Sequence, residues 1–136
     1  MPRPDVWVAA GTYTPTLDAS GESEPADPRG KTFELEPHVA LYGGFAGTET
    51  LFGERDIDAN ETILSGDLGA AIDNSDNCYH VVTGADDAVL DGFTVTRGNA
   101  DGEGEARALG GGMLNLGAAP IVAGCRCRDN AARRGG

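Results

Sequence analysis

The feature that most constrains the fold is an internal repeat of short, strand-like segments. Residues 89–96 (VLDGFTVT) and 121–128 (IVAGCRCR) agree position by position in their apolar, small and polar classes, and an Asn-Ala pair follows each, at 99–100 and 130–131. Glycines flank strand-like segments at positions 44, 66, 92 and 124, with separations of 22, 26 and 32 residues. Unequal periods of about 20 to 30 residues predict the coils of one solenoid, joined by loops of variable length.

The alternation of side chains within the repeat predicts how the coils stack. Phe93 and Val95 share one face of their segment, and the threonines at 94 and 96 share the other. One coil later, we expect Cys125 and Cys127 to lie above Phe93 and Val95, in parallel strands about 4.8 Å apart. Because this face is apolar, both cysteines are predicted to be buried thiols that neither bind metal nor form a disulfide with each other.

Strand-like segments continue along the whole chain, and no helix of normal length is predicted. One helical turn is expected around 51–55. Residues 17–30 and 100–109 are predicted to be exposed loops, because they combine glycine and acidic residues without periodicity. We therefore predict an all-β fold in one segment, 1–136, with an N-terminal strand and exposed loop at 1–30 and coils at 31–136. The expected strands lie within 6–14, 32–35, 39–45, 62–68, 79–83, 88–96, 113–116 and 120–128.

Charge and cysteine content exclude several classes of protein. The formal net charge is −12 and Lys31 is the only lysine, so phosphate backbones would repel the chain and no nucleic-acid partner is expected. Three cysteines without a C-x-x-C spacing are too few for a disulfide scaffold. No apolar run reaches the roughly 20 residues of a membrane span, and no signal peptide is recognised in residues 1–7.

Six segments spread over nearly the whole chain carry a family resemblance. They are VWVAAGTYTP (6–15), LYGGFAGTE (41–49), TILSGDL (62–68), YHVVTG (79–84), LDGFTVTRGNA (90–100) and GGGMLN (110–115). The chain thereby resembles bacterial right-handed β-helix repeat proteins of the pectate-lyase-like or polymorphic outer-membrane-protein-like kind. The resemblance implies a right-handed parallel β-helix and an extracellular or cell-surface location. Such proteins have more sequence before and further coils after these segments, so we expect an incomplete helix of few coils whose open end permits self-association.

One acidic stretch has some features of a calcium loop. Residues 73–77 (DNSDN) begin like an EF-hand loop, but Cys78 and Gly84 stand where that loop needs Gly and Glu. A hard-cation site of another kind would draw on Asp67, Asp73 and Asp76. A solvated turn rich in turn-forming residues is the simpler interpretation, and we assign no metal and no cofactor.

Carboxylates and arginines near the strands are the candidates for chemistry on polysaccharides. Glycoside hydrolysis needs two carboxylates across a bound sugar, for which the candidates are Asp86, Asp87 and Asp91. The family resemblance implies, for a lyase, carboxylate-bound calcium and a basic residue, and the candidates are Arg97, Arg126 and Arg128. Catalytic motifs of either kind are absent from the sequence, so these residues are interpreted as turn and outward-facing strand residues, and no catalytic residue is assigned.

The remaining candidates carry no chemistry by their spacing. His38 and His80 are not in a metal-ligand spacing, and His80 is predicted to face outward from a strand. Gly110 to Gly112 form no phosphate loop, because no GK[ST] and no helix follow. Asn60-Glu61-Thr62 is a glycosylation sequon that matters only in a eukaryotic secretory pathway.

Two functions follow as hypotheses. The first is a non-catalytic structural or adhesive segment of a surface or secreted protein, whose exposed face contacts polysaccharide or cell-surface glycan. The second is a fragment of a polysaccharide lyase or glycoside hydrolase of the pectate-lyase-like fold. Outward Thr and Asn residues would favour the first, and stacked outward Asp and Arg residues would favour the second. The sequence offers Thr94, Thr96 and Asn115 and no coherent acidic row, so the first is preferred.

Overall fold

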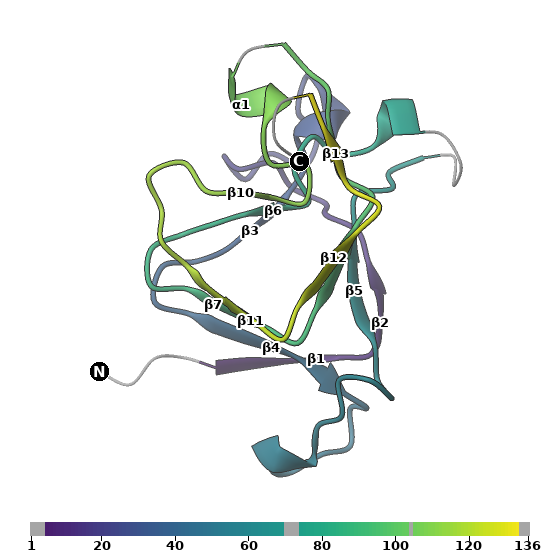
Figure 1. Ribbon diagram of the computed structural model, residues 1–136, viewed down its shortest axis with the longest axis vertical. Helices are drawn as coiled ribbons and strands as arrows, with labels where there is room; N and C mark the ends of the chain where they lie inside the picture. The colour runs from purple at the N-terminus through teal and green to yellow at the C-terminus, as the bar shows by residue number, and fades with distance from the viewer. Residues whose placement is uncertain (1–4, 70–73, 104, 134–136) are drawn as a thin grey trace.

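The computed structural model describes residues 5–69, 74–103 and 105–133, and all its paired strands run parallel. Three stacked sheets form the three sides of a triangle in Figure 1. The first sheet contains β1 (Asp5–Ala9), β4 (Ala40–Phe45), β7 (Val89–Asp91) and β11 (Ile121–Ala123). The second contains β2 (Gly11–Tyr13), β5 (Thr62–Ser65), β8 (Thr94–Thr96) and β12 (Arg126–Arg128).

The third side and one corner complete the winding. The third sheet contains β3 (Phe33–Glu34), β6 (Val82–Thr83) and β10 (Met113–Leu114), and a two-stranded sheet pairs β9 (Asn99–Ala100) with β13 (Ala131–Ala132). The chain visits the sheets in turn, so we define coil 1 as residues 5–39, coil 2 as 40–88, coil 3 as 89–120 and coil 4 as 121–133. This all-β arrangement of parallel strands is compatible with a β-solenoid.

The repeat of residues 88–96 and 121–128 is confirmed as parallel pairing in register. Val89 pairs with Ile121 and Val95 with Cys127. The sequence predicted that the two Asn-Ala pairs lie opposite each other. This is wrong by one residue, because Asn99 pairs with Ala131 and not with Asn130. Asn130 instead occupies the position of Gly98, where its Oδ1 accepts a hydrogen bond from the Gly98 N–H at 2.9 Å.

Glycines with positive φ form one corner of the triangle in three successive coils. Gly44, Gly92 and Gly124 have φ of 94°, 85° and 59°, a region that side chains with a Cβ rarely adopt. Ile57 packs along this corner, and a Cβ on Gly44 would lie 3.0 Å from its Cγ1. Gly66 does not belong to this series, because it follows β5 at another corner, where a Cβ would lie 2.5 Å from the Arg97 carbonyl oxygen. The predicted glycine series therefore mixes two corners.

The interior of the stack is filled by side chains from all three sheets. Leu90, Phe93 and Val95 of coil 3 are at most 2 % exposed and pack with residues of coils 1 and 2. Those partners include Leu35, Leu64, Val81, Val82 and Ala88. Alternation along β8 directs Val95 inward, and at roughly 25 cal/mol per Å² such burial is the main term that stabilises the fold.

The cysteine prediction is right in register and wrong in burial. Cys127 lies over Val95 as expected, but its thiol is exposed, and Cys125 is only half-buried. Among the described residues no strand lies beyond β12, so no coil covers its inner face. Cys78, in coil 2, is instead the fully buried cysteine, and all three are free thiols.

Loops and short helices agree with the predictions in part. The expected helical turn is a 3₁₀ turn, η2 (Phe52–Glu54), in the excursion from 46 to 61. Residues 17–30 are mostly exposed and contain a second turn, η1 (Pro28–Gly30). The 100–109 prediction is partly wrong, because a short helix, α1 (Glu105–Ala108), lies there and Ala100 and Ala108 are buried. A third turn is η3 (Asn74–Asp76).

Several predicted strands are shorter than expected. The segment 88–96 is divided at Gly92 into β7 and β8, and only Val82–Thr83 of the segment 79–83 is a strand. In the described parts of the chain, no helix has the length and apolar character that crossing a membrane requires.

Candidate functional site

A surface hollow of about 390 Å³ lies on the outer side of the second sheet, and we call it the second-sheet hollow. Leu64 and Val95 point into the core, so their neighbours Ser65 and Thr96 face this hollow. Both neighbours are less than 8 % exposed, and they therefore form its floor. The full lining is Thr12, Ile63, Ser65, Asp67, Thr96, Arg97, Arg128 and Asp129.

Ion pairs between coils 2 and 4 lie beside the second-sheet hollow. The Arg128 guanidinium contacts the Glu61 carboxylate at 3.3 Å, and Arg126 pairs with Asp58. The same Glu61 oxygen accepts a hydrogen bond from the Thr94 hydroxyl at 3.0 Å. Thr94 is 3 % exposed. The expectation that its hydroxyl is open to a ligand on the outer face is therefore wrong.

Asp67 has a carboxylate oxygen that lacks a donor. Its Oδ1 is buried and has no hydrogen-bond partner among the described residues, and its backbone N–H donates to the Ser65 hydroxyl at 3.2 Å. An unsatisfied buried acceptor costs about 1 to 3 kcal/mol, so any donor that gains access to this oxygen would bind it favourably. The sequence had suggested Asp67 only as a ligand of a hard cation.

The cation site that was considered from the sequence, and not assigned, is not assembled in the described part of the chain. Asp73 lies outside the described residues. Within the described residues, no group of three or more acidic, histidine or cysteine side chains is placed to hold a metal ion.

The carboxylates considered for glycoside hydrolysis have separate structural partners. Asp86 accepts the Ala119 N–H at 2.9 Å, Asp87 accepts from the His38 ring at 2.8 Å, and Asp91 pairs with Arg55 at 3.1 Å. Asp86 and Asp87 lie in the turn before β7, whereas Asp91 ends β7 on the outer face.

Hydrogen bonds lower the pKa values of four carboxyl groups in the described part of the chain. Backbone N–H groups of Glu22, Ala46 and Leu51 lower the pKa values of Asp18, Glu49 and Glu54, respectively, and the Tyr79 hydroxyl lowers that of Asp27. The general acid of a glycosidase needs the opposite shift.

The prediction for His80 needs correction, and the structure places the sequon within the fold. His80 lies outside β6 and is half-buried, with its Nδ1 donating to the Gly110 carbonyl at 3.0 Å, so it does not project from a strand. The sequon side chains are engaged in the fold, since Thr62 is 1 % exposed and the Asn60 amide donates to the Gly44 carbonyl.

Arg29 joins the 17–30 loop to two other coils and was not singled out from the sequence. Its Nε donates to the Asn77 carbonyl at 2.6 Å, and its Nη2 donates to the Asn99 carbonyl at 2.9 Å. The same Nη2 pairs with Asp101 at 2.6 Å. These partners are 48 to 72 residues away in the chain, so no local sequence signal could have found them.

Tyr79 lies between two guanidinium groups next to this junction. Arg29 is 4.2 Å and Arg107 4.9 Å from the ring centroid, and the hydroxyl donates to Asp27 at 2.7 Å. A broad groove of about 850 Å³ runs past this ring, between the 17–30 loop and the third sheet. Because its charged groups are already paired across the loops, we interpret this cluster as structural.

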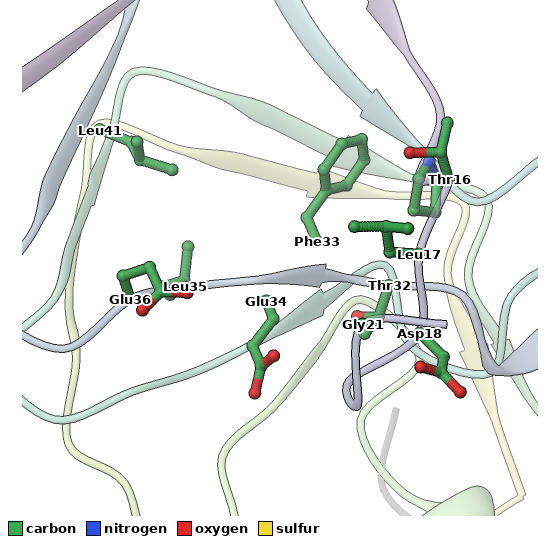
Figure 2. Close-up of a pocket in the computed structure, with 11 residues that line it drawn as sticks. Thr16, Leu17, Asp18, Gly21, Thr32, Phe33, Glu34, Leu35, Glu36 and Leu41 are labelled. Carbon is green, nitrogen blue, oxygen red and sulfur yellow. The ribbon is translucent and has the colours of Figure 1, made fainter. Parts of the chain in front are cut away.

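A third hollow opens at the coil 1 end of the stack, as Figure 2 shows. It measures about 350 Å³, and we call it the coil 1 hollow. Leu17, Phe33 and Leu41 point toward its interior, while the carboxylates of Glu34 and Asp18 point away. It is therefore an apolar opening with acidic groups nearby.

Comparison of the chain with protein-family models, with curated proteins and with solved structures finds no match. The geometry of the chain itself is therefore the basis for inferring its function.

Proposed function

We propose that this chain is a non-catalytic segment of a right-handed parallel β-helix, of the pectate-lyase-like or polymorphic outer-membrane-protein-like kind, from a bacterial surface or secreted protein. In this proposal it binds polysaccharide or cell-surface glycan through the second-sheet hollow. The observation that carries the binding site is the Asp67 Oδ1, a buried acceptor without a donor among the described residues of that hollow.

The chemistry of the lining suits a sugar. A sugar hydroxyl both donates and accepts hydrogen bonds, and the hollow combines carboxylate acceptors, guanidinium donors and hydroxyl groups that do either. Ligand sites generally have volumes of about 300 to 1,000 Å³, and the second-sheet hollow lies in that range at about 390 Å³.

A polysaccharide-degrading enzyme is the alternative, and the arrangement of charges supports it less. Asp86, Asp87 and Asp91 do not converge on one site, and Arg126 and Arg128 are paired with carboxylates.

The test is binding of a panel of neutral and acidic oligosaccharides, measured by isothermal titration calorimetry. We expect millimolar to micromolar binding of at least one class, and loss of at least tenfold in affinity for Asp67→Ala. Asp58→Ala is the matched control, because its 80 % exposed side chain lies outside the lining, and it should bind normally.

Two further measurements are needed. The first shows whether Asp67→Ala is still folded, and the second shows whether the chain catalyses polysaccharide degradation. Asp67→Ala removes an unsatisfied buried acceptor and should leave the free energy of unfolding unchanged or raised. Reducing-sugar and unsaturated-product assays on the same panel, with and without calcium, should stay at background. Absence of binding to the whole panel would reject the proposal, and turnover that Asp91→Ala or Arg126→Ala removes would establish the enzyme instead.

A further inference from the structure

The connection between β5 and β6 in coil 2 contains two buried oxygen atoms that lack a hydrogen-bond donor among the described residues. One is the Oδ1 of Asp67, and the other is the Oδ1 of Asn77. Asn77 is only 2 % exposed, so its amide is shut off from bulk solvent. Carboxylate and amide oxygens carry no hydrogen, so the two atoms cannot satisfy each other. Both therefore need a partner of the same kind from elsewhere.

Two contacts bring the start and the end of this connection together. The Cys78 N–H donates to the Gly66 carbonyl at 2.8 Å, and a Cβ added to Gly69 would meet the Asp76 carboxylate. The residues with the unpartnered oxygens lie between these two contacts, one at the start and one at the end of the connection. The half-buried carboxylate of Asp76 therefore lies in the same small region and adds further oxygen atoms.

Neighbouring coils hold the main chain of this region from both sides. The Arg29 side chain of coil 1 donates to the Asn77 carbonyl at 2.6 Å, and the Gly66 N–H donates to the Thr96 carbonyl of coil 3 at 2.9 Å. The oxygen atoms thus lie within the stack, and their arrangement does not depend on where the chain begins or ends. Groups that are held in this way are preorganised for a ligand.

The donor set suits a hard divalent cation. Calcium binds carboxylates, amide and backbone carbonyls and water, with six to eight oxygens in a flexible geometry. Two carboxylates and one amide supply part of this set, and backbone carbonyls or water would complete it. The set contains neither thiolate nor imidazole, which softer metals prefer. The net charge of −12 also favours a bound cation.

We propose that Asp67, Asp76 and Asn77 bind one calcium ion, which joins the start and the end of the connection between β5 and β6. The ligand set differs from the one considered from the sequence, because the Asn77 amide takes the place of a third carboxylate. The ion is structural, and its binding does not depend on the glycan proposal, although both involve Asp67. Glycan titrations in EDTA test Asp67 without the ion, and calcium titrations contain no sugar, so the two proposals can fail separately.

Isothermal titration calorimetry on the metal-free 136-residue chain tests the site. We expect one calcium ion per chain with a Kd between about 1 µM and 1 mM, and magnesium binding at least about tenfold weaker, because Mg²⁺ requires a regular octahedral ligand set. Asp67→Asn and Asp76→Asn should each lower the calcium affinity at least about tenfold. Asp58→Asn is the matched control, because it removes the same charge at an 80 % exposed position on the 46–61 excursion, and it should bind calcium normally.

Thermal melts separate loss of the ion from loss of the fold. Calcium at about one hundred times its Kd should raise the melting temperature of the unmodified chain and of Asp58→Asn by about 10 °C. In EDTA, Asp67→Asn and Asp76→Asn should melt cooperatively at a temperature close to that of the unmodified chain. Calcium should leave the melting temperatures of these two variants unchanged.

Asn77→Asp tests the role of the amide oxygen. The variant keeps an oxygen ligand and adds a third negative charge, so in EDTA it should melt at a lower temperature than the unmodified chain. Calcium should restore its stability and bind at least as tightly as in the unmodified chain. If the amide instead served as an N–H donor to Asp67, the loss of stability would be the same with and without calcium.

Four results would overturn the proposal. They are absence of calcium binding by the unmodified chain up to about 10 mM, an affinity that neither Asp67→Asn nor Asp76→Asn changes, equal weakening by Asp58→Asn, and a loss of stability in Asn77→Asp that calcium does not restore.

Discussion

Replacing Arg29 by Ala is expected to lower the free energy of unfolding by about 3 to 5 kcal/mol. The side chain is 18 % exposed and donates to two backbone carbonyls, of Asn77 and Asn99. A hydrogen bond from a charged group contributes about 1.5 to 3 kcal/mol. The ion pair with Asp101 adds less than about 1 kcal/mol, because that carboxylate is 48 % exposed. The contact with the Tyr79 ring at 4.2 Å adds about 1 kcal/mol.

These contributions are not additive, because they share one side chain, and the expected total is therefore below their sum. Urea unfolding followed by circular dichroism measures the change. Arg29→Lys should recover about half of it, since an ammonium group cannot reproduce the forked geometry of the guanidinium. Arg133→Ala, at an exposed position in coil 4, is the control and should change stability by less than about 0.5 kcal/mol.

Limited proteolysis supplies a second readout for the same variant. If Arg29 holds the 17–30 loop against coils 2 and 3, cleavage within this loop should accelerate in Arg29→Ala under native conditions. A stability loss of less than about 1 kcal/mol, with an unchanged cleavage rate, would refute the reasoning that the loop is held through this side chain.

Three further predictions concern the interior and the thiols. Cys127 should react with a thiol reagent in the native protein within seconds to minutes. Cys78 should react only on unfolding, because burial raises the pKa of its thiol to about 12. Mass mapping of the labelled sites checks this prediction, and fast labelling of Cys78 would contradict it. Phe93→Ala should cost about 3 to 5 kcal/mol in urea unfolding, because the ring is 2 % exposed in the core; a cost near zero would show that the core is not packed there. Tyr79→Phe removes the hydrogen bond that lowers the pKa of Asp27. A carboxyl group with a lowered pKa in the folded state stabilises the fold at pH values above its unfolded pKa of about 4. The difference in the free energy of unfolding between Tyr79→Phe and the unmodified chain should therefore be complete at neutral pH and vanish as the pH falls through the folded pKa of Asp27. A difference that is constant with pH would refute this prediction.

The stacking of the coils could be predicted from the sequence because the repeat is nearly regular where the strands are buried. The pairs Val89–Ile121 and Val95–Cys127 follow directly from matching apolar and polar classes. After β8 and β12 the residue types no longer match, although the pairing of the coils continues in the same register through Arg97 and Asp129, which both adopt positive φ, of 67° and 54°. Such corners are set by backbone conformation, and similarity of side chains does not reveal them.

The candidate site could be predicted only in part. Outward placement of Arg126 and Arg128 follows from alternation along the strand, but their partners Asp58 and Glu61 come from an excursion of coil 2 whose path has no periodic signal. The exposure of Cys127 also escaped prediction, because alternation gives the direction of a side chain and does not indicate whether another coil covers it.

The pairing of strands only between successive turns also determines how the chain can fold. The closest partners of the second sheet, such as Ile63 and Thr94, are 31 residues apart, and Gly11 and Thr62 are 51 residues apart. Closing the longer connection costs only about 0.4 kcal/mol more than closing the shorter one. Chain entropy therefore gives little preference for which pair of strands forms first during folding. Burial does rank the pairs, because β4 and β5 of coil 2 and β7 and β8 of coil 3 each contact a neighbouring strand on both sides. Folding is therefore expected to be slow, as for other chains dominated by non-local contacts, with a nucleus in coils 2 and 3 from which the outer turns are added in either direction.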